Sequence, residues 1–137
     1  MDEQVIGDVQ SSWKVVEGIA PQAAALFYSN LFEADPSLRA LFRGDMDEQG
    51  RKLMQMIGAA VGKLTDLDSL VPVLQGLARR HLDYGVEESH YGTVGGALLK
   101  TLEQELGAAF TPGVKASWTA VYDSVSTVMI SASKTAE

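Results

Sequence analysis

The chain has 137 residues, of which 46% are apolar and 21% are charged, and it carries a formal net charge of −7. This length and composition indicate a single domain, residues 1–137, that can bury a core of its own, and they exclude a disordered or fibrous chain. The negative charge argues against non-specific binding to nucleic acid or to an acidic membrane surface, because the field of the whole protein repels polyanions.

The sequence contains no cysteine, which excludes thiol catalysis, thiolate metal sites and disulfides. Its first ten residues, MDEQVIGDVQ, are acidic and lack a long apolar run, so they do not predict a signal peptide. No stretch of about 18 apolar residues predicts insertion into a membrane. We therefore expect a cytoplasmic protein.

The first half of the chain shows the spacing of helices. Asp2 can cap a first helix, and Pro21 is typical of the first turn of a second. Segment 37–42 is too short for more than one or two turns, and either Asp45 or Asp47 can cap the next helix. The inward faces of the three longer helices are Val5, Val9, Trp13 and Val16; Ala24, Phe27, Tyr28, Leu31 and Phe32; and Leu53, Met54, Ile57, Val61 and Leu64.

The second half predicts three more helices. One spans about 67–84, another runs from about 87 to 106, and Thr111 followed by Pro112 is typical of the start of the last. No run of alternating residues predicts a strand. We expect an all-α protein with six main helices and a short one. The apolar faces of the last two helices are Tyr91, Val94, Leu98, Leu102 and Leu106; and Val114, Trp118, Val121, Tyr122, Val125, Val128 and Met129.

The helix over 67–84 carries the most informative side chain. His81 shares an apolar face with Leu70, Leu74, Leu77 and Ala78, so its imidazole is expected to point inward. A core histidine with ordinary hydrogen-bond partners explains this pattern. An axial ligand of a flat, apolar metal cofactor also explains it, with the neighbouring arginines pairing with acidic edges of that cofactor, although the segment alone favours the core histidine. The segment alone leaves both interpretations open.

Six stretches, taken in order, resemble one family: Trp13, LFYSNLF at 26–32, DPSLRALF at 35–42, QGRKLMQ at 49–55, RRHLDYGVEESHY at 79–91 and SWTAVY at 117–122. The chain is similar to the bacterial single-domain globins related to the haem domain of flavohaemoglobins, and especially to the Hell's Gate type of globin. The resemblance covers nearly the whole chain. It implies the globin fold, a three-over-three sandwich of helices around haem b, iron protoporphyrin IX.

The resemblance also implies roles for particular residues. His81 would be the proximal ligand of the iron, and Phe42 would pack on the haem face. Tyr28 and Gln49 would line the opposite, distal side, where Leu53 would restrict the space above the iron. Taken singly, each of these residues also fits an ordinary core or surface position. Further haem contacts are expected from Ile57, Leu77, Val86, Tyr91, Val94 and Met129, and contacts to the propionates from Lys52, Arg79 and Arg80.

The function that the resemblance implies is reversible binding of O2, CO and NO at a five-coordinate iron. Hydrogen bonds from Tyr28 and Gln49 would give high O2 affinity. Detoxification of nitric oxide, or weak peroxidase activity, would need an external reductase, because the sequence holds no flavin or nicotinamide fingerprint. The alternatives are a globin-fold sensor or interaction module that acts through a separate partner, and an ordinary helical bundle, which would be colourless.

Two positions need separate mention. Flavohaemoglobins place a tyrosine and a glutamate beside the proximal histidine; Tyr91 matches the tyrosine, but Ser133 stands where the glutamate is expected and Glu137 lies too far along. The sequence therefore does not predict activation of the histidine by a carboxylate. His90, in an acidic segment at a helix start, is expected to be mainly structural or exposed, with contact to a propionate as the lesser alternative.

Overall fold

The computed structural model describes residues 2–42, 44–83 and 86–135. Within these ranges the chain is helical and forms no strand, which confirms the all-α prediction. The six main helices and the short one after the second are present, and the structure adds a further short helix, η2. In chain order the elements are α1 (Glu3–Glu17), α2 (Ala20–Ala34), η1 (Pro36–Leu41), α3 (Met46–Gly62), α4 (Leu67–Asp83), α5 (Glu88–Leu106), η2 (Gly107–Ala109) and α6 (Pro112–Thr135).

Polar caps fix where several helices begin. The Asp2 carboxylate accepts a hydrogen bond of 2.8 Å from the backbone N–H two residues on. The Asp45 carboxylate accepts one of 2.9 Å from the N–H of Asp47, so Asp45 is the cap of α3 and Asp47 lies in its first turn. The Thr111 hydroxyl accepts one of 3.2 Å from the N–H of Val114 at the start of α6. Each contact satisfies a donor that the helix itself leaves unpaired.

The boundaries around the connection from α4 to α5 differ slightly from the prediction. Helix α4 ends at Asp83, and α5 begins at Glu88 with Glu87 as its cap. Tyr84 and Gly85, where the helix predicted over about 67–84 is expected to end, lie outside the described residues. Pro72 is in the second turn of α4 without ending the helix.

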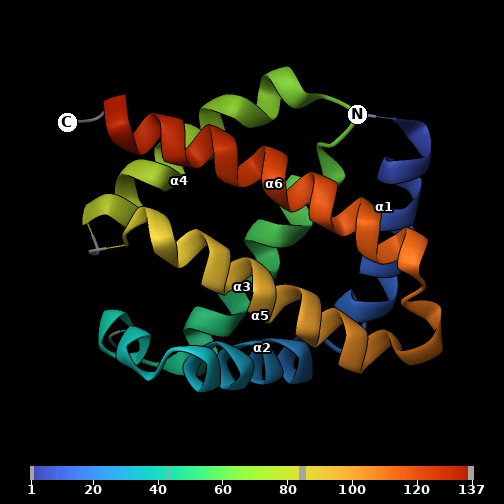
Figure 1. Cartoon of the computed structure of the whole chain (residues 1–137), viewed down its shortest axis with the longest axis horizontal. Helices are drawn as coiled ribbons and strands as arrows, with labels where there is room; N and C mark the ends of the chain where they lie inside the picture. The colour runs from blue at the N-terminus through green and yellow to red at the C-terminus, as the bar shows by residue number, and fades with distance from the viewer. Residues whose placement is uncertain (1, 43, 84–85, 136–137) are drawn as a thin grey trace.

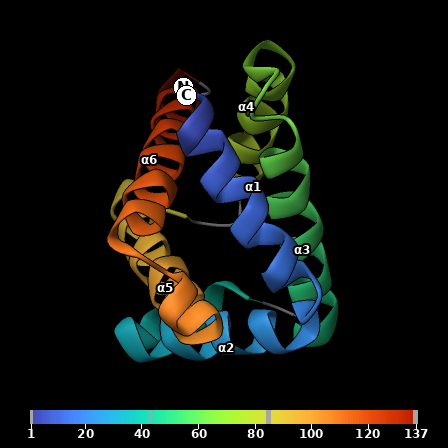
Figure 2. The ribbon, with the colours of Figure 1, turned by 90° about the vertical axis from the view of Figure 1, so that its right-hand side faces the viewer.

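The helices form two sides with a crossing helix between them. Figure 2 shows α5 and α6 on one side, α3 and α4 on the other, α1 between the two and α2 across the base. In Figure 1, α5 and α6 lie in front, with α3 and α4 behind them. The main packing partners are α2 with α5, α4 with α6, and α1 with α6. Residues far apart in the sequence thus face a common interior.

That interior is divided into two apolar clusters. The larger joins α1, α2, α3, α5 and α6 and includes Trp13, Phe27, Leu31, Val61 and Trp118. The smaller joins α4, the first turn of α5 and the end of α6, and it consists of Leu70, Leu74, Ala78, Tyr91, Met129 and Ala132.

Hydrogen bonds fix α6 against α1. The Ser117 hydroxyl donates to the Asp8 carboxylate at 2.8 Å, and the Trp118 indole N–H donates to the Ser12 hydroxyl at 2.8 Å. The Trp118 ring lies 6.2 Å from that of Trp13, tilted by 58°. The orientation of Trp118, whose other side faces the cavity described below, is thereby set.

Candidate functional site

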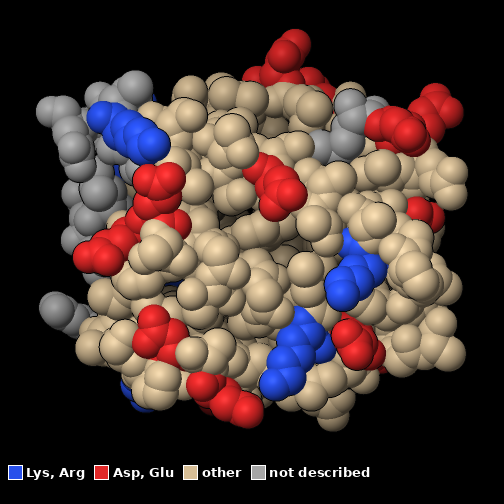
Figure 3. All heavy atoms as spheres, in the orientation of Figure 1, with Lys and Arg blue, Asp and Glu red and all other residues tan. Residues whose placement is uncertain are grey.

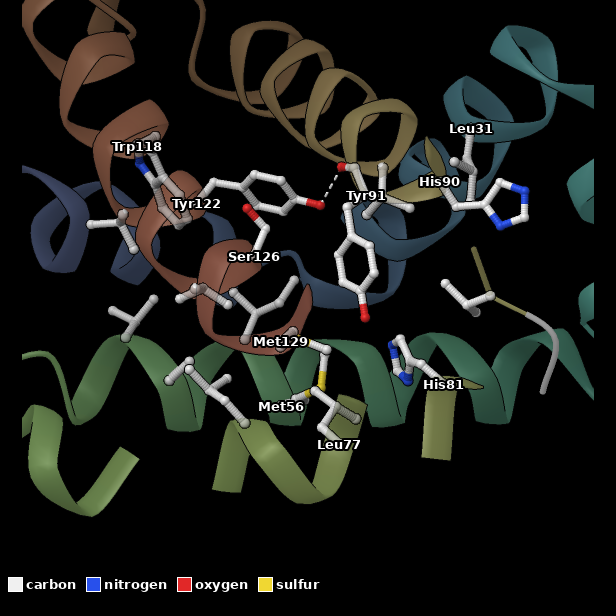
Figure 4. A pocket seen from close by; sticks show the side chains of 18 of the residues that line it. Leu31, Met56, Leu77, His81, His90, Tyr91, Trp118, Tyr122, Ser126 and Met129 are labelled. Carbon is white, nitrogen blue, oxygen red and sulfur yellow. Dashed lines mark hydrogen bonds between the residues drawn. The ribbon is translucent and has the colours of Figure 1, made fainter. Parts of the chain in front are cut away.

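A cavity of about 190 Å³ lies where the two apolar clusters meet. It is larger than an apolar cavity of about 150 Å³ that can hold benzene. Figure 4 shows the side chains of helices on both sides directed toward it. In Figure 3 the face above α5 and α6 is hollowed near its centre and mainly uncharged there. The cavity is lined by residues of six helices, α2, η1, α3, α4, α5 and α6, and by Phe42 and Val86 in the connections between them. The helical residues are Leu31, Leu38, Met56, Ile57, Ala60, Val61, Leu74, Leu77, His81, His90, Tyr91, Val94, Trp118, Val121, Tyr122, Val125, Ser126 and Met129.

The lining explains why the core is divided. Leu31, Val61 and Trp118 belong to the larger cluster, whereas Leu74 and Met129 belong to the smaller. Core residues normally pack without gaps larger than a water molecule. An apolar space at the junction of two clusters is therefore the place where a flat, apolar group would complete the core.

His81 reaches this cavity from the last turn of α4. Its Nδ1 atom is buried and has no hydrogen-bond partner among the described residues. Burial lowers the pKa of the imidazole below its usual 6.5, and the nearby charge of Arg80 lowers it further. The backbone carbonyl of Leu77, one turn earlier, acts in the opposite direction and raises the pKa without reversing the shift. The ring is thus held neutral, the form in which histidine binds metals.

This pKa shift predicts that acid destabilises the haem-free chain. In the unfolded state His81 takes up a proton near pH 6.5, whereas the folded state resists protonation. The unfolded state then binds more protons, so stability is complete above about pH 6.5 and falls as the pH drops toward the lower folded-state pKa. Urea unfolding at pH 7.5 and pH 5.5 should show this loss. In His81→Gln the free energy of unfolding should change less between the two pH values. An unchanged loss of stability would contradict the assignment.

Two tyrosines support the histidine side of the cavity. The Tyr91 ring points its hydroxyl end toward His81 (Figure 4). The Tyr122 hydroxyl donates a hydrogen bond of 2.5 Å to the backbone carbonyl of Tyr91, which links α6 to the first turn of α5. Burial raises the pKa of both hydroxyls, so both stay protonated at neutral pH.

Of the residues predicted from the sequence, eight line the cavity: Phe42, Ile57, Leu77, His81, Val86, Tyr91, Val94 and Met129. Tyr28, Gln49, Lys52, Leu53 and Arg80 do not. Leu53 packs against the larger cluster, and Gln49 is half-buried in the first turn of α3. The Lys52 ammonium lies 3.7 Å from the Glu48 carboxylate on the surface, and Arg80 is exposed.

Tyr28 lies beside the cavity in a cluster of aromatic rings. Its ring centre is 5.2 Å from that of Phe42, which does line the cavity, with an interplanar angle of 70°. Burial raises the pKa of the Tyr28 hydroxyl to about 12. No hydrogen bond joins this hydroxyl to another of the described residues. Tyr28 is thus a protonated potential donor one ring away from the cavity.

His90 has a structural role at the cavity rim. Its Nδ1 accepts a hydrogen bond of 2.9 Å from the N–H of Glu87, the residue before α5. This contact agrees with the expectation that His90 is mainly structural.

Sequence reasoning assigned no site role to several residues of the cavity wall. The sequence places Trp118, Val121, Tyr122 and Val125 on the apolar face of the last helix. It places Ala60 on a side of small residues that a neighbouring helix or a flat ligand can approach closely, but it gives no such signal for Met56 or Ser126. The available signal was that this face continues at helical spacing to Met129, which was predicted to touch haem.

Two features are absent from the part of the chain that the structure describes. No three or more His, Cys, Asp or Glu side chains of the described residues are grouped so that they could hold a metal ion. None of the helices described is long and apolar enough to cross a membrane.

Comparison with known proteins gives matches in both sequence and structure. The sequence profile of the Globin family matches residues 25–129. A neuroglobin of Danio rerio is 33% identical over 144 aligned positions, which cover 94% of this chain and 90% of the neuroglobin. A flavohemoprotein of Vibrio cholerae serotype O1 is 28% identical over 133 positions, which cover 95% of this chain. The chain spans only 34% of that flavohemoprotein.

Among solved structures, an engineered carbene transferase named for a nitric oxide dioxygenase of Rhodothermus marinus superposes with a TM-score of 0.89. The superposition covers 99% of this chain and 95% of the other. Because the two sequences are 22% identical, this likeness shows the fold alone.

Proposed function

Since the chain belongs to the globin family, we propose that it is a haem protein that binds O2, CO and NO reversibly, with His81 as the proximal ligand of the iron. The observation that carries this proposal is His81 itself. A neutral imidazole, whose Nδ1 has no hydrogen-bond partner in the part of the chain that the structure describes, stands at an apolar cavity between two clusters of the core. In the neutral form one ring nitrogen can bind iron while the other can donate a hydrogen bond, for which the backbone carbonyl of Leu77, one turn earlier, is available.

The residues around the cavity fit haem b in three respects. Their side chains are almost all apolar or aromatic, as a porphyrin requires. The absence of cysteine means that the group would be held without a thioether bond. Arg80 is exposed yet close enough to act on the pKa of His81, so its guanidinium can pair with a propionate at the rim. Lys52 and Arg79, also exposed, are the further candidates.

When bound, haem iron supplies a site for diatomic ligands and gives O2 more negative charge than CO. Around that ligand, Phe42 and Leu53 would exclude water, and the Tyr28 hydroxyl would donate a hydrogen bond. Gln49, four residues before Leu53 on α3, would supply a second donor. Such donors favour the charged ligand and slow its release, which predicts high O2 affinity. The proposal requires the ligand side of the cavity to reach the Tyr28 hydroxyl.

Replacing Tyr28 by Phe tests this role with little change of shape. A hydrogen bond worth about 1–3 kcal/mol in a dry pocket corresponds to an O2 dissociation rate raised about tenfold or more. Stopped-flow displacement of O2 by CO measures the rate. Dissociation of CO should change much less, since CO carries less charge. Equal effects on the dissociation rates of the two ligands, or no effect on that of O2, would contradict a hydrogen bond from Tyr28 to bound O2.

A more specific proposal is that the protein uses bound O2 to detoxify nitric oxide. It would consume O2 and need electrons from a reductase. The alternative is a sensor or interaction module that acts through a separate partner. Steady consumption of NO by the purified protein with a reductase and O2 favours detoxification, whereas gas-dependent capture of a partner without turnover favours the sensor.

A further inference from the structure

Three aromatic rings next to the cavity contact one another pairwise; we call them the ring triad. Tyr28 and Phe32 are stacked, with ring centres 5.9 Å apart and planes 17° apart. Phe42 stands edge-on to both, at 5.2 Å from Tyr28 and 5.5 Å from Phe32. Both side chains proposed for the ligand side, Tyr28 and Phe42, therefore belong to one packed unit, and a shift of one ring displaces the others.

Arg39 in η1 covers the outer side of the ring triad. Its guanidinium carbon lies 5.6 Å from the centre of the Phe32 ring, within the range of cation–π attraction. Its Nη1 donates to the backbone carbonyl of Phe42 at 3.3 Å and lies 3.7 Å from the sulfur of Met46 in the first turn of α3. No carboxylate of a described residue lies within ion-pair distance of it. The side chain thus contacts Phe42 and Met46 on either side of the turn into α3.

The contacts of Arg39 restrain Phe42 at a point where the backbone leaves the helix η1 and its carbonyl is no longer held by helical hydrogen bonds. Phe42 is the first residue after η1, and its N–H donates to the carbonyl of Arg39 at 3.2 Å. Its own carbonyl is no longer part of the helix, and the Arg39 side chain supplies the donor. A planar guanidinium can stack on one ring and donate in its own plane at once, whereas an ammonium acts as a point charge.

We propose that Arg39 is a positioning residue for the ligand side of the pocket: by holding Phe32 and the Phe42 carbonyl together, it fixes the Tyr28 hydroxyl and the Phe42 ring for a bound gas. This inference rests on the proposed function for its consequence, and on the contacts above for its geometry. It names a residue that touches neither haem nor ligand in the proposed site.

The test compares Arg39→Gln and Arg39→Lys with the matched control Arg51→Gln. Arg51 lies on α3 with its side chain 68% exposed, and its guanidinium is 4.0 Å from the carboxylate of Glu48. The first measurement is hydrogen exchange of segment 36–46 in the full chain after haem removal. The second is the O2 dissociation rate of the haem-bound protein. Loss of the stacking and the hydrogen bond should raise both rates about two- to fivefold in Arg39→Gln, with Arg39→Lys between it and the wild type.

Each outcome has one meaning. Faster exchange and faster O2 release in Arg39→Gln, with Arg51→Gln unchanged, support the proposal. Exchange equal to that of Arg51→Gln overturns it, and faster exchange with unchanged O2 release reduces Arg39 to a structural residue and overturns it as well. Failure of the proposed function appears separately: wild-type protein would then bind no haem, and the exchange comparison would still decide whether Arg39 holds the ring triad.

Discussion

Replacing His81 by alanine should abolish stable haem binding. The cavity would keep its apolar contacts with the porphyrin, but the bond between the imidazole and the iron would be lost. Removing even a group that only orients a metal ligand weakens metal binding about 10–100-fold, so loss of the ligand itself should speed haem release on the order of a hundredfold or more. Transfer of haem to an excess of a competing apoprotein, followed by absorption, measures this rate.

The only other histidine of the sequence provides the control. His90→Ala removes the acceptor for the Glu87 N–H at the start of α5, which should cost about 1 kcal/mol of stability. Haem binding should persist in this variant. Added imidazole should partly restore the spectrum of His81→Ala by occupying the vacated space. If His90→Ala loses haem and His81→Ala keeps it, the ligand assignment is reversed.

Replacing Gly95 by alanine should destabilise the fold through the wall of the cavity. A Cβ atom at this position would lie 2.6 Å from Cε2 and 2.9 Å from Cδ2 of Tyr122, closer than real side chains approach. The Tyr122 ring cannot withdraw freely, because its hydroxyl is bonded to the Tyr91 carbonyl. Overpacking of this kind typically costs about 1–3 kcal/mol, which exceeds the gain of up to about 1 kcal/mol in helix propensity.

Gly96 is the matched control for this variant. It follows Gly95 in α5, and a Cβ atom there would have nothing within 4 Å. Gly96→Ala should therefore raise the free energy of unfolding by up to about 1 kcal/mol, while Gly95→Ala lowers it. Urea unfolding of both variants measures the two signs. Two changes of the same sign and size would show that the contact between Gly95 and Tyr122 does not constrain the fold.

Much of the fold could be predicted because it depends on local rules. The Asp2 cap, the Thr111 and Pro112 start of α6 and the apolar faces of the helices follow from spacing and from the needs of helix ends. The inward direction of His81 follows in the same way from the leucines on its face. The likeness to bacterial globins, drawn from ordered motifs, is confirmed by the family match over residues 25–129.

The rest depends on contacts between helices, which periodicity cannot specify. Spacing places Tyr122 on an inward face, but only the fold shows that its ring lies on Gly95 and its hydroxyl on Tyr91. In the same way, nothing in the local sequence indicates that Arg39 lies over Phe32. Local spacing also allows two caps for α3. The hydrogen bond from the N–H of Asp47 to the Asp45 carboxylate identifies Asp45 as the cap.

In the site, too, some residues follow from helical spacing and others depend on contacts between helices. Residues on the inward faces of helices, such as Leu77, Val94 and Met129, line the cavity as expected. Tyr28 and Gln49 were placed by resemblance, and whether they reach a bound ligand depends on the arrangement of the ring triad. That dependence is why the Tyr28 and Arg39 variants are informative together.

The most direct test of haem binding through the His81 cavity is the absorption spectrum of the purified wild-type protein. It should be recorded oxidised, reduced, and reduced under O2 and under CO, with haem added if the preparation lacks it. We expect an intense Soret band that shifts on reduction and shifts again, reversibly, with each gas. A protein that stays without a Soret band after haem is added would contradict the account and favour the interaction module.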